Sequence, residues 1–128
     1  DEGEFLYTFD LFSKKFILHN FKINSSSSNK FFNNTLIIKN EQYLEAINIL
    51  NGKTFWQIES KLNRDSKILN IKNVNGHLTI FMDDGKILII KEGIISEIFD
   101  IKIKKINSYY FSENKIITIQ KNGKIGVF

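Results

Sequence analysis

The feature that most constrains the fold is an internal repeat of about 40 residues. The stretch "LTIFMDDGKILII", which starts at Leu78, aligns without a gap with "IITIQKNGKIGVF", which starts at Ile116, 38 residues later (78 to 116). The same spacing relates Glu4–Phe21 to Gln42–Glu59, and each of these stretches has the pattern of a strand, a polar turn and a second strand. We infer that one supersecondary unit is used several times along the chain.

The spacing of the repeat is not uniform. From position 42 to position 85 the interval is 43 residues, and we place the extra residues in the loop around Arg64. The surrounding stretch Ser60–Lys67 is predicted to be a loop with at most one helical turn. The lead-in stretches also recur, because "SSNKFFNNTL" at Ser27–Leu36 resembles "NSYYFSENKI" at Asn107–Ile116.

Strand patterns dominate the chain. Period-two runs rich in β-branched and aromatic residues are separated by turn residues, and there is no proline to interrupt them. No segment has the periodicity of a long amphipathic helix. The sequence therefore predicts an all-β fold, and the clearest runs are Leu36–Asn40, Leu78–Asp84, Lys86–Ile90, Ile116–Gln120 and Lys124–Phe128.

Two tight hairpins are explicit in the sequence. Asp84-Gly85 and Asn122-Gly123 each lie between two strand patterns. Aspartate-glycine and asparagine-glycine pairs favour two-residue turns in which both residues take a positive φ, because the twist of such turns matches that of the strands. We therefore predict a two-residue hairpin at each pair.

A repeat of about 40 residues with four short strands is typical of β-propeller blades, each a sheet of four antiparallel strands. The chain would supply about three blades, while a closed ring needs about four to eight. Because Phe128 lies inside a strand pattern, we expect a segment of a larger, seven- or eight-bladed propeller rather than open ends that pair with other chains. The predicted parts are the outer strands of one blade at 1–23, blades at 24–62 and 63–102, and a partial blade at 103–128.

Composition sets wide limits on the class of protein. With 42% hydrophobic and 25% charged residues, the chain resembles one ordinary folded domain. It has no apolar run long enough to span a membrane, and "DEGEF" at its start is not a leader sequence. The absence of cysteine excludes disulfides and thiolate metal sites but does not identify the compartment.

The net charge of +4 does not point to nucleic acid. The lysines are scattered, and the densest basic stretch, "KIKK" at Lys102–Lys105, alternates with Ile103 as the solvent face of a strand would. It also lacks the neighbouring aromatic residues of a nucleic-acid-binding motif. We expect no nucleic-acid partner.

One motif in the second repeat carries a resemblance to a known family. Ala46, Asn48, Gly52 and Trp56 have the spacing A-x-N-x-x-x-G-x-x-x-W. This resembles the A-x-D-x-x-x-G-x-x-x-W signature of quinoprotein-type propeller repeats, named after pyrroloquinoline-quinone enzymes. The resemblance implies that Trp56 docks between neighbouring blades, that Ala46 on the facing strand leaves room for it, and that Gly52 makes the turn.

The motif is weaker elsewhere in the chain. Asn48 replaces the usual aspartate, and so keeps a hydrogen-bonding side chain without the charge. The last two repeats keep only the hairpin, and the usual Ser-Ser-Pro lead-in survives as Ser27-Ser28-Asn29. The N-terminal repeat keeps the aspartate but departs at the other three positions, with Thr8, Asp10, Lys14 and Leu18.

Such degenerate blades look most like those of the lipoprotein propeller subunit of the outer-membrane β-barrel assembly machine. The resemblance covers nearly the whole chain and implies a non-enzymatic scaffold in the periplasm at the outer membrane. It implies protein partners, namely the barrel-inserting subunit or unfolded barrel precursors, and contact with the membrane only through a lipid anchor outside this segment. It implies no cofactor, no metal ion and no catalytic residue. This function comes from the likeness of the fold alone.

Two other classes of function remain open. A quinoprotein dehydrogenase would need paired carboxylates, an arginine over the quinone and a stacking tryptophan, whereas this chain has one arginine, in a predicted loop, and its tryptophan fits the docking motif. A sensor or adhesin with a propeller ectodomain would share every feature of this sequence. It would differ only in its flanking segments.

The remaining candidate sites have simpler interpretations. His19 and His77 lack the closely spaced partners of a metal site, and Asp83-Asp84 before a glycine is typical of a hairpin turn. The serines at 25–28 have no base motif beside them. The aromatic run Tyr109–Phe111 could stack on a ligand, but a matching pair in an earlier repeat favours a packing role.

Overall fold

The structure is a computed structural model that describes residues 3–24, 28–41, 43–59 and 62–128. All regular elements in these ranges are β-strands, as the sequence predicts, and none is a helix. No helical segment long and apolar enough to span a bilayer exists among these residues. The strands are β1 (Gly3–Asp10), β2 (Lys15–Asn24), β3 (Ser28–Phe32), β4 (Thr35–Lys39), β5 (Tyr43–Asn48), β6 (Thr54–Glu59), β7 (Ile68–Val74), β8 (His77–Met82), β9 (Lys86–Lys91), β10 (Ile94–Asp100), β11 (Ile106–Ser112), β12 (Lys115–Gln120) and β13 (Ile125–Val127).

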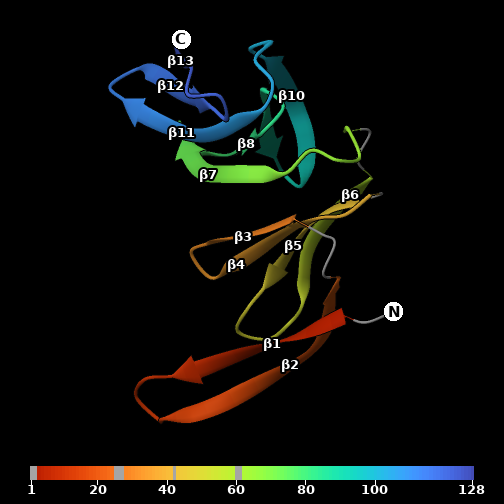
Figure 1. Ribbon diagram of the computed structural model, residues 1–128. Coiled ribbons are helices and arrows are strands. Elements are labelled where there is room, and N and C mark those ends of the chain that lie inside the picture. The colour runs from red at the N-terminus through yellow and green to blue at the C-terminus, as the bar shows by residue number, and fades with distance from the viewer. Residues whose placement is uncertain (1–2, 25–27, 42, 60–61) are drawn as a thin grey trace.

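The strands form four antiparallel sheets in sequence order (Figure 1). The first sheet contains β1 and β2, the second β3 to β6, the third β7 to β10 and the fourth β11 to β13. Within each sheet every strand pairs with its neighbour in sequence, so each is a simple meander. The sheets follow one another from the red N-terminal hairpin to the blue C-terminal sheet, which is the arrangement of successive propeller blades (Figure 1).

Alternation along the strands gives the third sheet two buried faces. On one face Ile80, Met82 and Leu88 join Ile37 and Leu44 of the second sheet in a buried cluster. On the other face Phe81 and Ile87 pack against the fourth sheet, in a cluster completed by Ile106 and Tyr109. Burial on both faces explains why the central strands β8 and β9 are largely apolar.

The two predicted hairpins form, but the predicted turn geometry is wrong. In the pairs Asp84-Gly85 and Asn122-Gly123 only the glycine has a positive φ, 87° in both cases. The Gly85 N–H donates to the Met82 carbonyl at 3.2 Å, and the Gly123 N–H donates to the Gln120 carbonyl at 2.9 Å. These bonds define three-residue connections in which a β-turn is followed by a left-handed glycine.

Two-residue turns with two positive φ values occur at other places. They are Asn75-Gly76, with φ of 52° and 80°, and Glu92-Gly93, with φ of 51° and 75°. Lys14 in the β1–β2 turn and Gly52 in the β5–β6 turn are equivalent positions of the repeat. Both have a positive φ, 55° for Lys14 and 73° for Gly52. The left-handed backbone conformation at this position is thus the same in both turns, although the first has lysine instead of glycine.

Loop lengths locate the extra residues of the long repeat interval. The link between β6 and β7 takes residues 60–67, whereas the link between β10 and β11 takes 101–105. The β5–β6 turn is also longer than the β9–β10 turn, at 49–53 against 92–93. The predicted insertion around Arg64 therefore accounts for only part of the difference, and the described residues 62–67 form turns and irregular chain.

A repeated pair of backbone hydrogen bonds ties each link to the sheet that follows it. The Asp83 N–H donates to the Lys67 carbonyl at 2.9 Å, and 38 residues later the Lys121 N–H donates to the Lys105 carbonyl at 2.8 Å. We call this repeated pair the link clasp. It holds the residues just before β7 and β11 against the β8–β9 and β12–β13 turns.

Candidate binding cleft between the second and third sheets

The four residues of the family-like motif lie on β5, on β6 and in the turn between them. Ala46 on β5 is the ladder partner of Trp56 on β6, and its side chain is buried. Trp56 is half-buried and packs on the cluster shared by the second and third sheets. A Cβ atom placed on Gly93, in the β9–β10 turn, would lie 3.1 Å from the Trp56 Cβ. Sequence reasoning missed this close approach of Gly93 to the tryptophan.

The other two motif residues shape the β5–β6 turn. The Asn48 side-chain oxygen accepts a hydrogen bond from the Leu50 N–H at 2.9 Å, a bond that a short polar side chain makes to the backbone two residues on. The Asn48 carbonyl accepts from the Gly52 N–H at 2.8 Å. With its φ of 73°, Gly52 takes a conformation that other residues adopt at a cost.

The side chains of the hairpin residues also accept hydrogen bonds from nearby backbone N–H groups. The Asp84 carboxylate accepts from the Lys86 N–H at 3.2 Å, and the Asn122 side-chain oxygen accepts from the Lys124 N–H at 3.0 Å. These contacts agree with turn chemistry for Asp84. The surroundings of the two turn glycines differ, because a Cβ on Gly85 would overlap the Ile103 carbonyl oxygen, whereas one on Gly123 would meet nothing within 4 Å.

The basic stretch Lys102–Lys105 is not part of a strand, which corrects the prediction. It lies in the link between β10 and β11, where Lys102 and Lys105 have φ values of 59° and 54°. Its lysines are exposed and Ile103 is half-buried, so the alternation of polarity is real. Ile103 is held by the β8–β9 turn rather than by strand pairing.

The remaining candidates from the sequence are scattered. Within the described parts of the chain no three histidine, cysteine or acidic side chains gather into a possible metal site. Tyr109 and Phe111 pack on Phe81 with ring centroids 5.3 Å and 4.8 Å away, while Tyr110 is exposed. The side chain of His19 and the serines at 25–27 lie outside what the structure describes.

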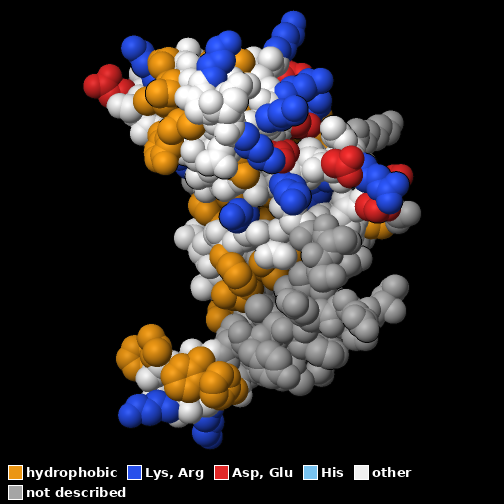
Figure 2. All heavy atoms as spheres, viewed as in Figure 1, with side chains coloured by type: hydrophobic (Ala, Val, Ile, Leu, Met, Phe, Trp, Pro, Cys, Tyr) orange, Lys and Arg blue, Asp and Glu red, His pale blue; other side chains and the backbone are white. Residues whose placement is uncertain are grey.

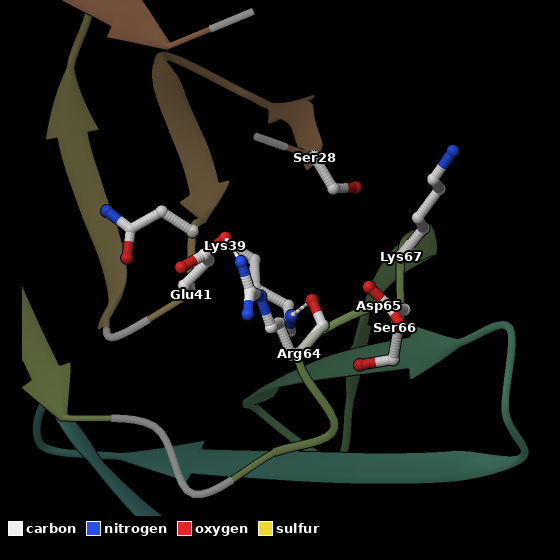
Figure 3. A pocket seen from close by; sticks show the side chains of 8 residues that line it. Ser28, Lys39, Glu41, Arg64, Asp65, Ser66 and Lys67 are labelled. Carbon is white, nitrogen blue, oxygen red and sulfur yellow. Dashed lines mark hydrogen bonds and ion pairs between the residues drawn. The ribbon is translucent and has the colours of Figure 1, made fainter. Parts of the chain in front are cut away.

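A polar cleft of about 370 Å³ opens between the second and third sheets (Figure 3). The end of β4 and the turn after it form one wall, and the link before β7 forms another. The start of β3 completes it. Its lining residues are Ser28, Lys39, Asn40, Glu41, Arg64, Asp65, Ser66 and Lys67.

Lys39 is the unusual residue of this cleft. Its side chain is 3% exposed, and its ammonium donates a hydrogen bond to the Arg64 carbonyl at 3.3 Å. Burial lowers the pKa of Lys39 from its ordinary value of 10.5, because desolvation disfavours the charged form, and the nearby carboxylates of Asp84, Asp83 and Asp65 oppose that shift. A buried cation is thus held in a cleft that solvent can enter.

The rim of the cleft carries both signs of charge, and Figure 2 shows basic and acidic side chains intermixed on this part of the surface. Arg64 and Glu41 form an ion pair at 2.6 Å, with both side chains mostly exposed. The Asp83 carboxylate, in the β8–β9 turn, accepts from the Lys67 N–H at 2.8 Å, and the Ser66 hydroxyl donates to the Asn63 carbonyl at 2.7 Å. These bonds fix the shape of the link that forms one wall of the cleft (Figure 3).

Sequence reasoning did not single out Lys39. It ends the strand pattern "LIIK", in which Leu36, Ile37 and Ile38 are buried together with it. A signal was available in the repeat, because the equivalent position 42 residues later is Phe81, which is also buried. A lysine at a position that holds an apolar residue in the next sheet marks a site worth testing.

A second, more apolar groove of about 640 Å³ lies between the outer strands of the same two sheets. Ile58 of β6 and Leu62 of the link line one wall, and residues of β10 line the other. β10 is the edge strand of its sheet and exposes Ile94, Ile98 and Phe99 by 62%, 52% and 49%. We call this feature the outer groove.

Comparison with solved structures identifies the fold. The chain is similar to BamB from Moraxella catarrhalis, with a TM-score of 0.65 and 16% identity over 98% of this chain and 37% of that chain. It is similar to the computationally designed Ika4 protein, with a TM-score of 0.65 and 14% identity over 98% and 79% of the two chains. Similarity to the WD40 domain of SCAP from fission yeast is lower, with a TM-score of 0.51 and 17% identity over 74% and 28%.

These likenesses confirm, at the level of the fold, the predicted propeller blades and the resemblance to the propeller subunit of the barrel assembly machine. No protein-family model and no curated protein sequence matches the chain. The chain spans little more than a third of the length of BamB. The shared fold is that of propeller proteins, and identities this low carry no information about a reaction.

Proposed function

We propose that this chain is part of a non-enzymatic propeller scaffold that binds protein partners during outer-membrane β-barrel assembly in the periplasm. The likeness of its fold to BamB supports this proposal. In this proposal the membrane is reached through a lipid anchor outside these residues, and the partners are the barrel-inserting subunit or unfolded barrel precursors. We also propose that residues 24–62 form one blade and residues 63–102 the next. In this proposal Trp56 docks between these two blades.

The observation that carries the proposal is the outer groove. β10 is an edge strand, so its outer backbone groups are not used by a neighbouring strand of its sheet. An extended peptide can add to such an edge by backbone hydrogen bonds, with alternate side chains entering adjacent pockets. The apolar walls formed by Ile58, Leu62 and Ile98 suit the alternating apolar residues of a strand from an outer-membrane barrel.

The quinoprotein alternative has less support from the described residues. Trp56 packs on the shared core and against Gly93, and Arg64 pairs with Glu41 at the surface. Both side chains thus have partners within the chain. A sensor or adhesin ectodomain would bind neither probe of the experiment below.

The test is the binding of a labelled strand peptide from an outer-membrane barrel protein, measured by fluorescence anisotropy, and of the periplasmic region of the barrel-inserting subunit, measured by calorimetry. Ile98→Glu places a charge in the outer groove and should weaken binding by about tenfold or more. The matched control is Tyr110→Glu, because Tyr110 is exposed to a similar degree, 55%, on another sheet. Absence of binding to both probes, or equal effects of the two variants, would contradict the proposal.

A further inference from the structure

We propose that the cleft at Lys39 binds one carboxylate group of a protein, with the Lys39 ammonium and the Ser28 hydroxyl as its hydrogen-bond donors. This site is separate from the outer groove and has a different ligand chemistry. The inference does not depend on the scaffold proposal.

The first support is the unsatisfied hydrogen-bonding capacity of Lys39. An ammonium has three donor hydrogens. Among the described residues it makes one hydrogen bond, to the Arg64 carbonyl, and the ion pairs found there, Arg64 with Glu41 and Lys86 with Asp100, do not include it. A buried charge with spare donors gains more than an exposed lysine does when an anion binds beside it.

The second support is Ser28, which lines the same cleft. Its hydroxyl oxygen accepts a hydrogen bond from the Ile68 N–H at 2.9 Å. That bond occupies an acceptor position of the hydroxyl and leaves its hydrogen available to donate. Figure 3 shows Ser28 at the edge of the opening, with its hydroxyl pointing toward the wall that carries Lys67.

The balance of charge selects a carboxylate over an anion of higher charge. The lining contains Lys39, Arg64 and Lys67 against Glu41 and Asp65. Asp83 and Asp84 add negative charge close enough to act on Lys39. A doubly charged phosphate meets more repulsion from these carboxylates than a singly charged carboxylate does.

The third support is the comparison between repeats. Phe81, at the equivalent position of β8 42 residues after Lys39, is buried and gives the next sheet an apolar side chain there. A buried lysine is costly to place, and the fold of the next sheet does without one. The ammonium is therefore best explained by a ligand that needs it.

The experiment follows the Lys39 side chain by NMR in the full chain, labelled with ¹³C at lysine. Its εCH₂ signal is assigned as the one that Lys39→Met removes. The probes are acetyl-Gly-Gly-Gly with a free carboxylate, the same peptide as its amide, acetyl-Gly-Glu-Gly-amide and inorganic phosphate. We expect a saturable shift of the Lys39 signal with a carboxylate probe and a rise in the pKa of Lys39 on binding, because an adjacent anion favours the charged form.

Two variants test the assignment. Lys39→Met should weaken carboxylate binding by about tenfold or more. Lys30→Met, which changes an exposed lysine on β3 of the same sheet, should leave it within about twofold. Saturation by the free-carboxylate tripeptide identifies a chain terminus as the source, and saturation by the glutamate peptide identifies an acidic side chain.

Three outcomes would overturn the proposal. They are no saturable shift with either carboxylate probe, an equal response to the amide control, and phosphate binding as tight as that of the carboxylates. The wild-type titration decides these outcomes without any variant. The proposal therefore remains testable even if Lys39→Met does not fold.

Discussion

The third sheet meets its two neighbours through seams of different kinds. The first seam, with the second sheet, combines an apolar cluster with the half-buried Trp56 and the polar Lys39 cleft. Beside its link, the second seam, with the fourth sheet, is packed by Phe81 and Tyr109 and by a buried hydrogen bond of 2.5 Å from the Tyr109 hydroxyl to the Met82 carbonyl. A groove of about 500 Å³ opens farther along this seam, near the β7–β8 turn.

The links explain much of this difference. Residues 60–67 connect the sheets of the first seam and residues 101–105 connect those of the second. In the second seam the shorter link packs its backbone at Ile103 against Gly85, and the Ile106 N–H donates to the Asp83 carbonyl at 3.0 Å. In the first seam the described part of the longer link lines a cleft. Beside their links, similar sheets thus pack closely or leave a cleft according to the length of the link between them.

The sharpest way to break the second seam is Gly85→Ala. Alanine at a φ of 87° is strained, and its Cβ would overlap the Ile103 carbonyl oxygen, which is backbone and cannot rotate away. We expect a loss of about 3 kcal/mol in the free energy of unfolding, measured by urea denaturation. Gly123→Ala has the same φ with open space around it, so it should cost about 1 kcal/mol. Equal losses would show that Ile103 does not confine the turn.

The first seam is tested by Trp56→Ala. Removal of this half-buried ring takes contacts from the cluster shared by the second and third sheets, and we expect a loss of about 2 kcal/mol in the free energy of unfolding. The control is Phe55→Ala on the same strand, whose side chain is 58% exposed and whose loss should be below about 1 kcal/mol. If the two variants lose the same free energy of unfolding, Trp56 does not dock between the blades.

The smallest expected effect is a gain in stability from Lys39→Met. The substitution replaces a buried charged side chain in the first seam by an apolar one of similar length, and should raise the free energy of unfolding by about 1 kcal/mol at neutral pH. Urea denaturation of both proteins measures this difference.

The pH dependence of that gain follows from the lowered pKa of Lys39. Between this lowered pKa and the ordinary value of 10.5, the unfolded chain binds more protons than the folded chain, so the stability of the wild type rises with pH. The variant lacks this contribution. The difference between the two proteins should therefore shrink as the pH approaches 10.5, and a constant difference would contradict the burial of the Lys39 charge.

The strands were predictable because they depend on local pattern. Period-two runs and the 38-residue offset between Gly85 and Gly123 identify the β8–β9 and β12–β13 hairpins without any tertiary information. The turn type was not predictable from the Asp-Gly and Asn-Gly pairs, because such pairs occur in both two-residue and three-residue connections. The glycine took the left-handed position in each case, and its partner did not.

The candidate site was less predictable because it depends on residues far apart in sequence. Lys39 and Arg64 meet across the first seam, and Gly93 approaches Trp56 from another sheet. A single sequence shows the pattern of residues within each strand. It does not show which residues of another sheet the connecting link places against that strand. The signal for the cleft in the repeat pattern is the presence of lysine at position 39 where the next repeat has the apolar Phe81.

The link clasp has a consequence for cooperativity. Each clasp joins residues that are close in sequence, Lys67 with Asp83 in one case and Lys105 with Lys121 in the other. Contacts of such short range let a link and the sheet after it form and open together as one unit. Protection of these amides from hydrogen exchange should therefore change sheet by sheet, with each sheet's stability set by its own strands and by its nearest neighbours.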